Sequence, residues 1–323
     1  MRPIRRLLVA VKDPMAQPLP AVAKAIQLAR AFGAELEFFH TLDTSLYVDM
    51  LDMEETRLLP PAADERAQFL QRLERIAARA RLHGVKVTVA AEWDYPVPEA
   101  IVRRAATIDA DLIVAECHLG RHIAAGLRGL ADRELVRLSP VPVLLVKERR
   151  PYYRPTVLAA VDPGHTFSKP VKLDEEILRL GAAVAGALRG KLHAVHACAS
   201  APANFAMIDA ATAARFPPLE TTAANRRFEQ LLAQSDVPPA RRHLLAGCPS
   251  DGVRLTARHL HSAIVVMGAI SRSGLKGVFI GNTAERLLGQ LPCDLLVVKP
   301  AQFENNVARE RPGPHVARVA PLF

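Results

Sequence analysis

Short runs of apolar residues alternate along the chain with longer stretches in which apolar residues recur at helical spacing. Within the runs there is little polar alternation, as expected for strands covered on both faces of a sheet. In the first half the runs lie at Leu7–Val11, Leu36–His40, Val85–Ala91, Leu112–Ala115 and Val143–Val146. Amphipathic segments such as Ala21–Phe32 and Glu65–His83 separate them. This order predicts five parallel strands joined by helices.

The same pattern then occurs a second time. The predicted strands of the second half lie at Thr156–Val161, Lys191–His196, Arg242–Leu245, Ala263–Met267 and Asp294–Val298. The run LLVAV is followed by Asp13 and the run VLAAV by Asp162, while LLVKE near residue 147 corresponds to LLVVKP near residue 299. The offset is 152 positions both between residues 116 and 268 and between residues 147 and 299. A repeat of this length indicates a duplicated domain.

Strands that alternate with helices predict an α/β protein built from two tandem doubly wound, Rossmann-like parallel-sheet domains. We expect the first domain at residues 1–149 and the second at 155–300, with a short Pro-flanked linker at Glu148–Pro155. A linker of this length predicts that the domains pack together. The Pro-containing tail at residues 301–323 is expected to be disordered.

Composition narrows the function classes. The net charge is +9, yet only 5% of residues are aromatic and no basic block stands out, which argues against specific nucleic-acid binding. No apolar run reaches the length of a membrane span, so a cytoplasmic location is expected. The four cysteines show no CxxC spacing, which predicts neither a zinc site nor a disulfide framework.

The strongest candidate for chemistry is the segment after the fourth strand of the second half. Gly268 ends that strand, a hydroxyl-rich loop with Ser271 and Ser273 follows, and Gly281 precedes the next helix. Asn282 and Glu285 have the spacing of a helix cap. Glycines let backbone approach a phosphate, and the free amides of a helix N-terminus can receive it. An ordinary capped helix after a tight loop explains the same residues equally well.

The sequence resembles the universal stress proteins, in particular their tandem members. The resemblance spans nearly residues 1–300 and is carried by GNTAERLL, by LLVKE and LLVVKP, and by the first-strand motif VDP. It implies a strand order of 3-2-1-4-5 in each domain, with a ligand site where strands one and four diverge. It also implies that the tandem domains pair with each other as family dimers do, with the strands in LLVKE and VVKP as the contact edges. A homodimer of the whole chain is left open.

The resemblance further implies a site for ATP or another adenine nucleotide, with Mg, in the second domain. The residues that it assigns to this site are Asp162, Met267, Gly268, Ser271, Arg272, Ser273, Gly281, Asn282 and Thr283. The family pattern of Gly, two residues, Gly, nine residues, Gly, Ser or Thr is half kept, because Ser271 replaces a glycine and Asn282 replaces a hydroxyl residue. Binding is therefore expected to be weak.

The first half lacks this pattern. Glu116 stands opposite Gly268, Leu119 opposite Ser271 and Leu130 opposite Asn282, and only Gly129 keeps the glycine of Gly281. A carboxylate and a leucine disfavour a phosphate, so we expect the first half to bind no phosphate and to supply an interface.

No catalytic arrangement emerges, and the prediction is a non-enzymatic binding and regulatory protein. His40 and His196 end equivalent strands, which is typical of a structural role, and His118 with His122 lack carboxylate support for a metal site. The alternative is a protein that binds a small or apolar ligand or a partner through its long loops at Thr41–Ala62 and Ala199–Leu219, without nucleotide. A weak ATPase is a third option.

Overall fold

The computed structural model places ten strands in one sheet, in the order β4-β2-β1-β5-β6-β11-β10-β7-β8-β9. It describes residues 3–42, 56–57, 63–117, 125–163, 172–198, 219–269, 282–300, 303, 307–308 and 316–317. Within each half, numbering the five strands of the large sheet along the chain gives the order 3-2-1-4-5, and all pairings inside a half are parallel. The predicted fold class is thus confirmed, and the two half-sheets are fused into one.

The strands follow the apolar runs to within a few residues. They are β1 (Arg6–Ala10), β2 (Glu35–Leu42), β4 (Val87–Trp93), β5 (Leu112–Glu116), β6 (Val143–Val146), β7 (Thr156–Ala160), β8 (Lys191–Cys198), β9 (Arg242–Ala246), β10 (Ile264–Gly268) and β11 (Asp294–Val298). The helices are α1 (Pro20–Phe32), α2 (Ala63–Leu82), α3 (Val97–Thr107), α4 (Ala125–Leu138), α5 (Leu173–Ala187), α7 (Leu219–Leu232), α8 (Pro249–His259) and α9 (Asn282–Gln290). A second, two-stranded sheet pairs β3 (Thr56–Arg57) with β12 (Val316–Ala317).

Local sequence signals explain where individual helices begin and end. Helix α1 starts with Pro20, whose fixed φ suits the first helical position, and stops at Gly33, which adopts the left-handed φ of 66°. Helix α2 carries Asp64 and Glu65 in its first turn and arginines in its last, which complements the helix dipole.

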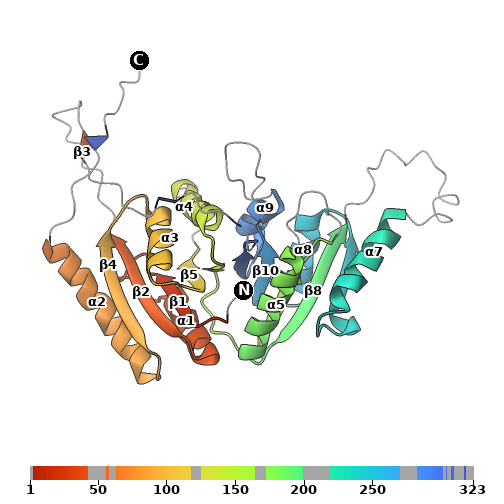
Figure 1. Ribbon diagram of the computed structural model, residues 1–323, viewed down its shortest axis with the longest axis horizontal. Helices are drawn as coiled ribbons and strands as arrows, with labels where there is room; N and C mark the ends of the chain where they lie inside the picture. Colours follow the sequence, from red (N-terminus) through yellow and green to blue (C-terminus); the bar gives the residue numbers. More distant parts are fainter. Residues whose placement is uncertain are drawn as a thin grey trace, which may run out of the picture.

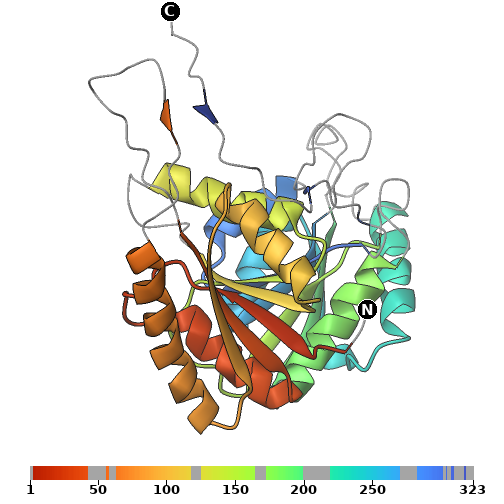
Figure 2. The same cartoon turned by 60° about the vertical axis from the view of Figure 1, so that its left-hand side comes forward.

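Helices cover both faces of the sheet, and each face has one continuous core that runs through both halves (Figures 1 and 2). One core joins residues of α1 and α2 to residues of α5 and α7, and the other joins α3 and α4 to α8 and α9. The strand residues between these layers are almost fully buried, for example Leu8, Ile113 and Val265. Because neither core stops at the boundary between halves, hydrophobic burial holds the two halves together.

The halves meet through their last strands, which run antiparallel. Leu144 of β6 pairs with Leu296 of β11, and the flanking pairs are Val143 with Val297 and Leu145 with Leu295. Leu144 and Leu296 are 152 positions apart, so each is the counterpart of the other. A pseudo-twofold axis therefore passes through this pair, as in the self-complementary interface of a symmetric dimer. The prediction that these strands are the contact edges is confirmed.

At this junction a lysine of each half donates hydrogen bonds to the other half. Lys147 Nζ donates to the carbonyl oxygens of Leu288 and Leu291, at the carboxyl end of α9, over 2.5 and 3.3 Å. Its counterpart Lys299 donates to the carbonyl oxygen of Arg137 in the last turn of α4 over 3.3 Å. Burial lowers the pKa of both lysines, that of Lys299 to about 8. Each half thus places a cation at the negative end of the other half's last helix.

One contact has no counterpart and anchors the linker. Asp294 is fully buried, and its Oδ2 accepts from Lys24 Nζ and from the Tyr152 hydroxyl, each over 2.5 Å. Its Oδ1 accepts from the backbone amides of Lys147 and Glu148 over 2.8 and 3.0 Å. Burial, together with the adjacent Asp294 carboxylate, raises the pKa of Tyr152 well above its ordinary value. The position that matches Asp294 in the first half is Pro142, so this network exists only once.

Part of the tail expected to be disordered contacts the fold. Val307 is 9% exposed and belongs to the second core, and Val316–Ala317 pair with Thr56–Arg57. Disorder of the remaining tail stays a prediction. The long loops through which the alternative function would bind a ligand or a partner, Thr41–Ala62 and Ala199–Leu219, lie almost entirely outside the described residues.

We expect Asp294→Ala to lower the free energy of unfolding by about 3–5 kcal/mol, because it leaves the buried Lys24 ammonium unpaired. Urea titration followed by far-UV circular dichroism measures this. The matched control is Glu35→Ala, which removes the partner of Lys86 from an exposed ion pair and should cost roughly 0–1 kcal/mol. Equal effects of the two variants would contradict the role given to Asp294.

The first half expressed alone, as residues 1–150, should aggregate or self-associate. Its strand β6 is buried along its whole length in the full chain and would present an apolar, unpaired edge. Analytical ultracentrifugation measures the outcome. A stable monomer without affinity for residues 151–323 would show that the junction is dispensable.

Candidate functional site

The carboxyl ends of β7 and β10 meet at the predicted site of the second half. Ala160 pairs with Met267, so Gly268, the last residue of β10, and Asp162, which comes shortly after β7, lie at the same edge. The Asp162 amide donates to Asp174 Oδ1 over 3.0 Å, which fixes the turn after β7 onto the start of α5. The Asp162 side chain is 45% exposed, so its carboxylate remains accessible at this edge.

Gly268 has a packing role that the sequence did not indicate. A Cβ at this position would lie 2.7 Å from Leu173 Cδ2 and 3.2 Å from Ile177 Cδ1, both on α5. Leu173 and Ile177 are buried, so they have little room to move. The glycine lets α5 approach the end of β10, whether or not a ligand binds there.

Helix α9 begins at Asn282, so the residue predicted to cap this helix is instead its first helical residue, and Thr283 in the first turn is partly buried. Met267 is 5% exposed and packs in the second core, so its side chain belongs to the core next to this edge. The predicted site residues Ser271, Arg272, Ser273 and Gly281 lie outside the described residues, as do His118 and His122. The structure thus brings Asp162, Met267 and Gly268 together at one edge.

His40 and His196, predicted to end their strands, lie within β2 and β8, and they have the structural role that the sequence favoured. His40 Nδ1 lies 2.8 Å from the carbonyl oxygen of Val11, and His196 Nδ1 lies 3.1 Å from that of Val161. A carbonyl only accepts, so each Nδ1 carries the proton and donates it. The rings contact Phe69 and Phe228, with centroids 4.5 and 5.9 Å apart. Each histidine joins the second strand of its half to the end of the first.

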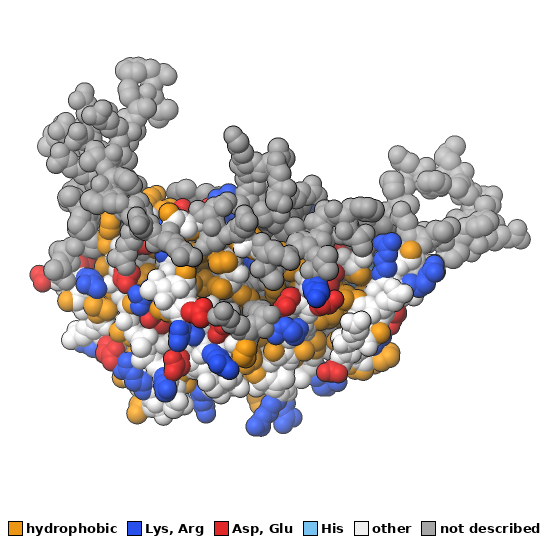
Figure 3. Space-filling model, in the orientation of Figure 1, with side chains coloured by type: hydrophobic (Ala, Val, Ile, Leu, Met, Phe, Trp, Pro, Cys, Tyr) orange, Lys and Arg blue, Asp and Glu red, His pale blue; other side chains and the backbone are white. Residues whose placement is uncertain are grey.

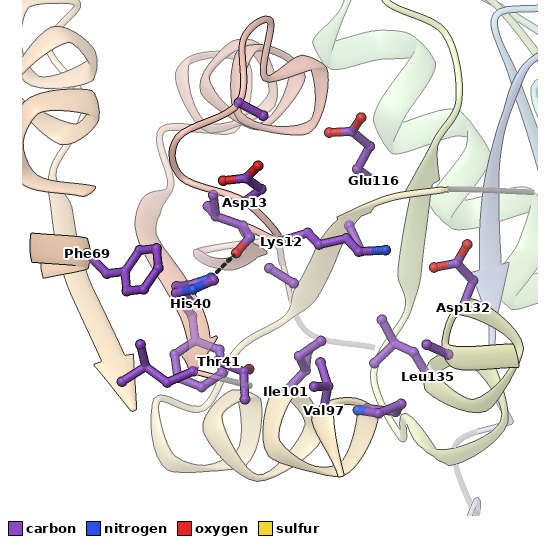
Figure 4. A pocket seen from close by; sticks show the side chains of 18 of the residues that line it. Lys12, Asp13, His40, Thr41, Phe69, Val97, Ile101, Glu116, Asp132 and Leu135 are labelled. Carbon is purple, nitrogen blue, oxygen red and sulfur yellow. Dashed lines mark hydrogen bonds between the residues drawn. The ribbon is translucent and has the colours of Figure 1, made fainter. Parts of the chain in front are cut away.

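A large cavity opens at the corresponding edge of the first half, which sequence reasoning had assigned only to an interface. Its volume is about 780 Å³, and it lies beyond the ends of β1, β2 and β5 (Figure 4). Val97, Ile101 and Leu135 form an apolar side, and Phe69 stands at one end beside His40 (Figure 4). This volume is within the range of about 300–1,000 Å³ that is usual for small-molecule sites.

Charged side chains face the same cavity. Asp13, Glu65, Glu116 and Asp132 contribute carboxylates, and Lys12 contributes an ammonium group. Burial raises the pKa of Glu116, an effect reinforced by Asp132 and opposed by Arg149 and Lys12. The sequence analysis did not identify Asp132 as a site residue. The offset of 152 that matches Glu116 to Gly268 also matches Asp132 to Ala284, and this difference between the halves could have revealed it.

The comparisons with known proteins agree with the duplicated architecture. A model of the universal stress protein family matches residues 3–147 and, separately, residues 156–299. The chain belongs to this family. Universal stress protein E of Escherichia coli K12 is 28% identical over 93% of this chain and 96% of its own length. The protein of the same name from Photorhabdus laumondii is 25% identical over 92% of this chain and 96% of its own length.

Solved structures of universal stress proteins share the fold. One, from Pseudomonas aeruginosa UCBPP-PA14, has a TM-score of 0.71 at 24% identity and covers 92% of this chain and 94% of its own. Another, from Archaeoglobus fulgidus, has a TM-score of 0.62 at 16% identity over 91% and 98%. The resemblance drawn from the sequence motifs is therefore confirmed at the level of family and fold.

On the face of this universal stress protein that Figure 3 shows, basic and acidic side chains are interspersed, and neither sign of charge forms a separate patch. Within the described part of the chain, no helix is long and apolar enough to cross a membrane. Among the same residues, no three or more His, Cys, Asp or Glu side chains are grouped as metal ligands would be.

Gly268→Ala should lower the free energy of unfolding by about 1–3 kcal/mol in the absence of any ligand, because Leu173 and Ile177 must shift to admit the methyl group. Thermal and urea unfolding measure it. Gly289→Ala in α9 is the control, since a Cβ there meets nothing within 4 Å and should stabilise the helix by up to ~1 kcal/mol. If Gly268→Ala left the free energy of unfolding unchanged, Leu173 and Ile177 would be able to move aside, and the packing role given to Gly268 would be wrong.

Proposed function

We propose that this protein is a non-enzymatic binding and regulatory module of the universal stress protein family, whose second domain holds an adenine nucleotide at low affinity. The observation that carries the proposal is the meeting of Asp162 and Gly268 at adjacent strand ends, with α9 beginning a short distance along the chain at Asn282. In doubly wound sheets such an edge, where strands one and four diverge, is the usual ligand site.

The chemistry of this edge suits an anion with a polar body. The amides at the start of α9 would receive phosphate, and the accessible Asp162 carboxylate would accept from a sugar hydroxyl or hold Mg²⁺ through water. Low affinity follows from the departures at Ser271 and Asn282, because a Cβ at 271 hinders close backbone approach to phosphate.

A second function class is favoured by the cavity of the first half. An accessible volume of about 780 Å³ with an apolar side would accommodate a small molecule without any phosphate-binding loop. In that case the protein would act as a ligand-binding module in which nucleotide has no part.

Calorimetric titration of ATP with Mg²⁺ tests the first proposal. We expect one weak site per chain. Ser271→Gly should strengthen binding about fivefold, equivalent to about 1 kcal/mol from one relieved backbone constraint. Asp162→Asn should weaken binding, and Asp251→Asn on α8 should leave it unchanged. Gly268→Glu is a poor test, because its Cβ would disturb Leu173 even without ligand.

Three results would count against this assignment. A stoichiometry near two would place nucleotide in both halves. If Asp162→Asn bound ATP as tightly as the parent protein, the nucleotide site would lie elsewhere. If even Ser271→Gly did not bind ATP, the ligand-binding alternative would be favoured. Release of phosphate from ATP by the purified parent protein, lost in Asp162→Asn, would establish the weak ATPase instead.

A further inference from the structure

The cavity of the first half is preformed by rigid elements. Its apolar residues Phe39, Ile101 and Leu135 are at most 7% exposed, and they come from β2, α3 and α4. They belong to the second core and are therefore held by packing on the far side of the cavity wall. A ligand would meet a fixed apolar surface here rather than one that must be assembled on binding.

The polar part of the same wall is dominated by negative charge. The lining side chains include four carboxylates and one lysine. Lys12 extends between Glu116 and Asp132, so its charge already faces two acidic neighbours (Figure 4). Asp13 lies near Lys12 on the side toward α1 (Figure 4). A phosphate or carboxylate placed in this cavity would be repelled by more groups than attract it.

Comparison of the two halves shows that this charge is specific to the first. Val9 pairs with Val114 as Ala159 pairs with Val266, so positions in β1 and β7 correspond at an offset of 150. Lys12 then stands where the second half has Asp162, and Asp13 stands opposite Pro163. Glu116 and Asp132 stand opposite Gly268 and Ala284. At the compared positions the first half thus has carboxylates at Asp13, Glu116 and Asp132 where the second half has none, whereas the second half has Asp162 where the first has Lys12.

The buried position of Asp132 and the partly buried position of Glu116 give a cation an electrostatic advantage. Asp132 is only 8% exposed, and burial raises the pKa of Glu116 despite the nearby charges of Lys12 and Arg149. A buried carboxylate gains more from an added positive charge than an exposed one, because solvent screens the pair less. The apolar wall opposite would favour a ligand whose remainder is hydrocarbon.

We propose that the first-half cavity binds an organic cation with an apolar body, an amine whose ammonium group lies against Glu116 and Asp132 and whose hydrocarbon part lies against Ile101 and Leu135. This site is separate from the nucleotide edge of the second half and does not depend on it. The internal duplication would then present two ligand edges of opposite preference, one for an anion and one for a cation.

Calorimetric titration of octylammonium, with octanol and octanoate as probes of equal chain length, tests the proposal. We expect octylammonium to bind once per chain, octanol to bind at least about tenfold more weakly, and octanoate to show no binding at millimolar concentration. Octanoate binding as well as octylammonium, or no binding of octylammonium at all, would overturn the proposal.

Variants separate the charge from the cavity. Glu116→Gln and Asp132→Asn should each weaken octylammonium about tenfold and leave octanol unaffected, because the shape is kept and only the charge is lost. The control is Glu134→Gln on α4, a carboxylate that pairs with Arg137 and does not line the cavity. Unchanged octylammonium affinity in both cavity variants would overturn the assignment of the site.

Two further readouts distinguish this site from the nucleotide site. Octylammonium should bind more weakly as pH falls, because Glu116, with its raised pKa, is protonated before an ordinary glutamate and then no longer attracts the ammonium group. ATP should not displace octylammonium, and Glu116→Gln should retain the ATP affinity of the parent. Competition between ATP and octylammonium would show that one cavity serves both and that the proposal is wrong.

Discussion

The antiparallel pairing of β6 with β11 is the constraint on which the rest of the structure depends. It turns two five-stranded half-sheets into one sheet, and it lets a single core run across each face of both halves. Because Leu144 pairs with its own counterpart Leu296, the junction is self-complementary and needs no surface that the repeat did not already have. The exchange of Lys147 and Lys299 follows from the same symmetry, since each lysine comes directly after its paired strand.

Asp294 breaks this symmetry, because it binds the linker between the halves and holds that linker in one conformation. A symmetric dimer of separate chains has no linker to hold, whereas this chain must lead from β6 back to β7 within a few residues. Asp294 accepts four hydrogen bonds, three of them from residues 147–152 and one from Lys24. Its buried charge is tolerated because every donor around it is in place, which makes the network costly to break one partner at a time.

The same symmetry frees the two ligand edges to diverge. Packing depends mainly on the apolar strands and helix faces, which both copies keep, so residues around the carboxyl ends of the strands can differ between the copies. In the second half these positions carry Asp162, Gly268 and Ala284, and in the first they carry Lys12, Glu116 and Asp132. Gly268 is more constrained, because a Cβ there would crowd the Leu173 and Ile177 side chains of α5. The duplication therefore preserves one scaffold and varies what the scaffold presents.

The sequence by itself determined the strands and the duplication, because apolar runs and a repeated pattern can be read along the chain. The strand order and the contact edges followed from its resemblance to the family. It also indicated that His40 and His196 are structural. Only the tertiary structure decided that the first half has a cavity, that Asp294 anchors the linker, and that a Cβ at Gly268 would crowd Leu173. Each of these depends on which side chains from distant segments come within a few ångströms, and a cavity is defined by the space that such side chains leave unfilled. Local sequence patterns determine the helices and strands, whereas the distances between their side chains are set only when the helices pack on the sheet.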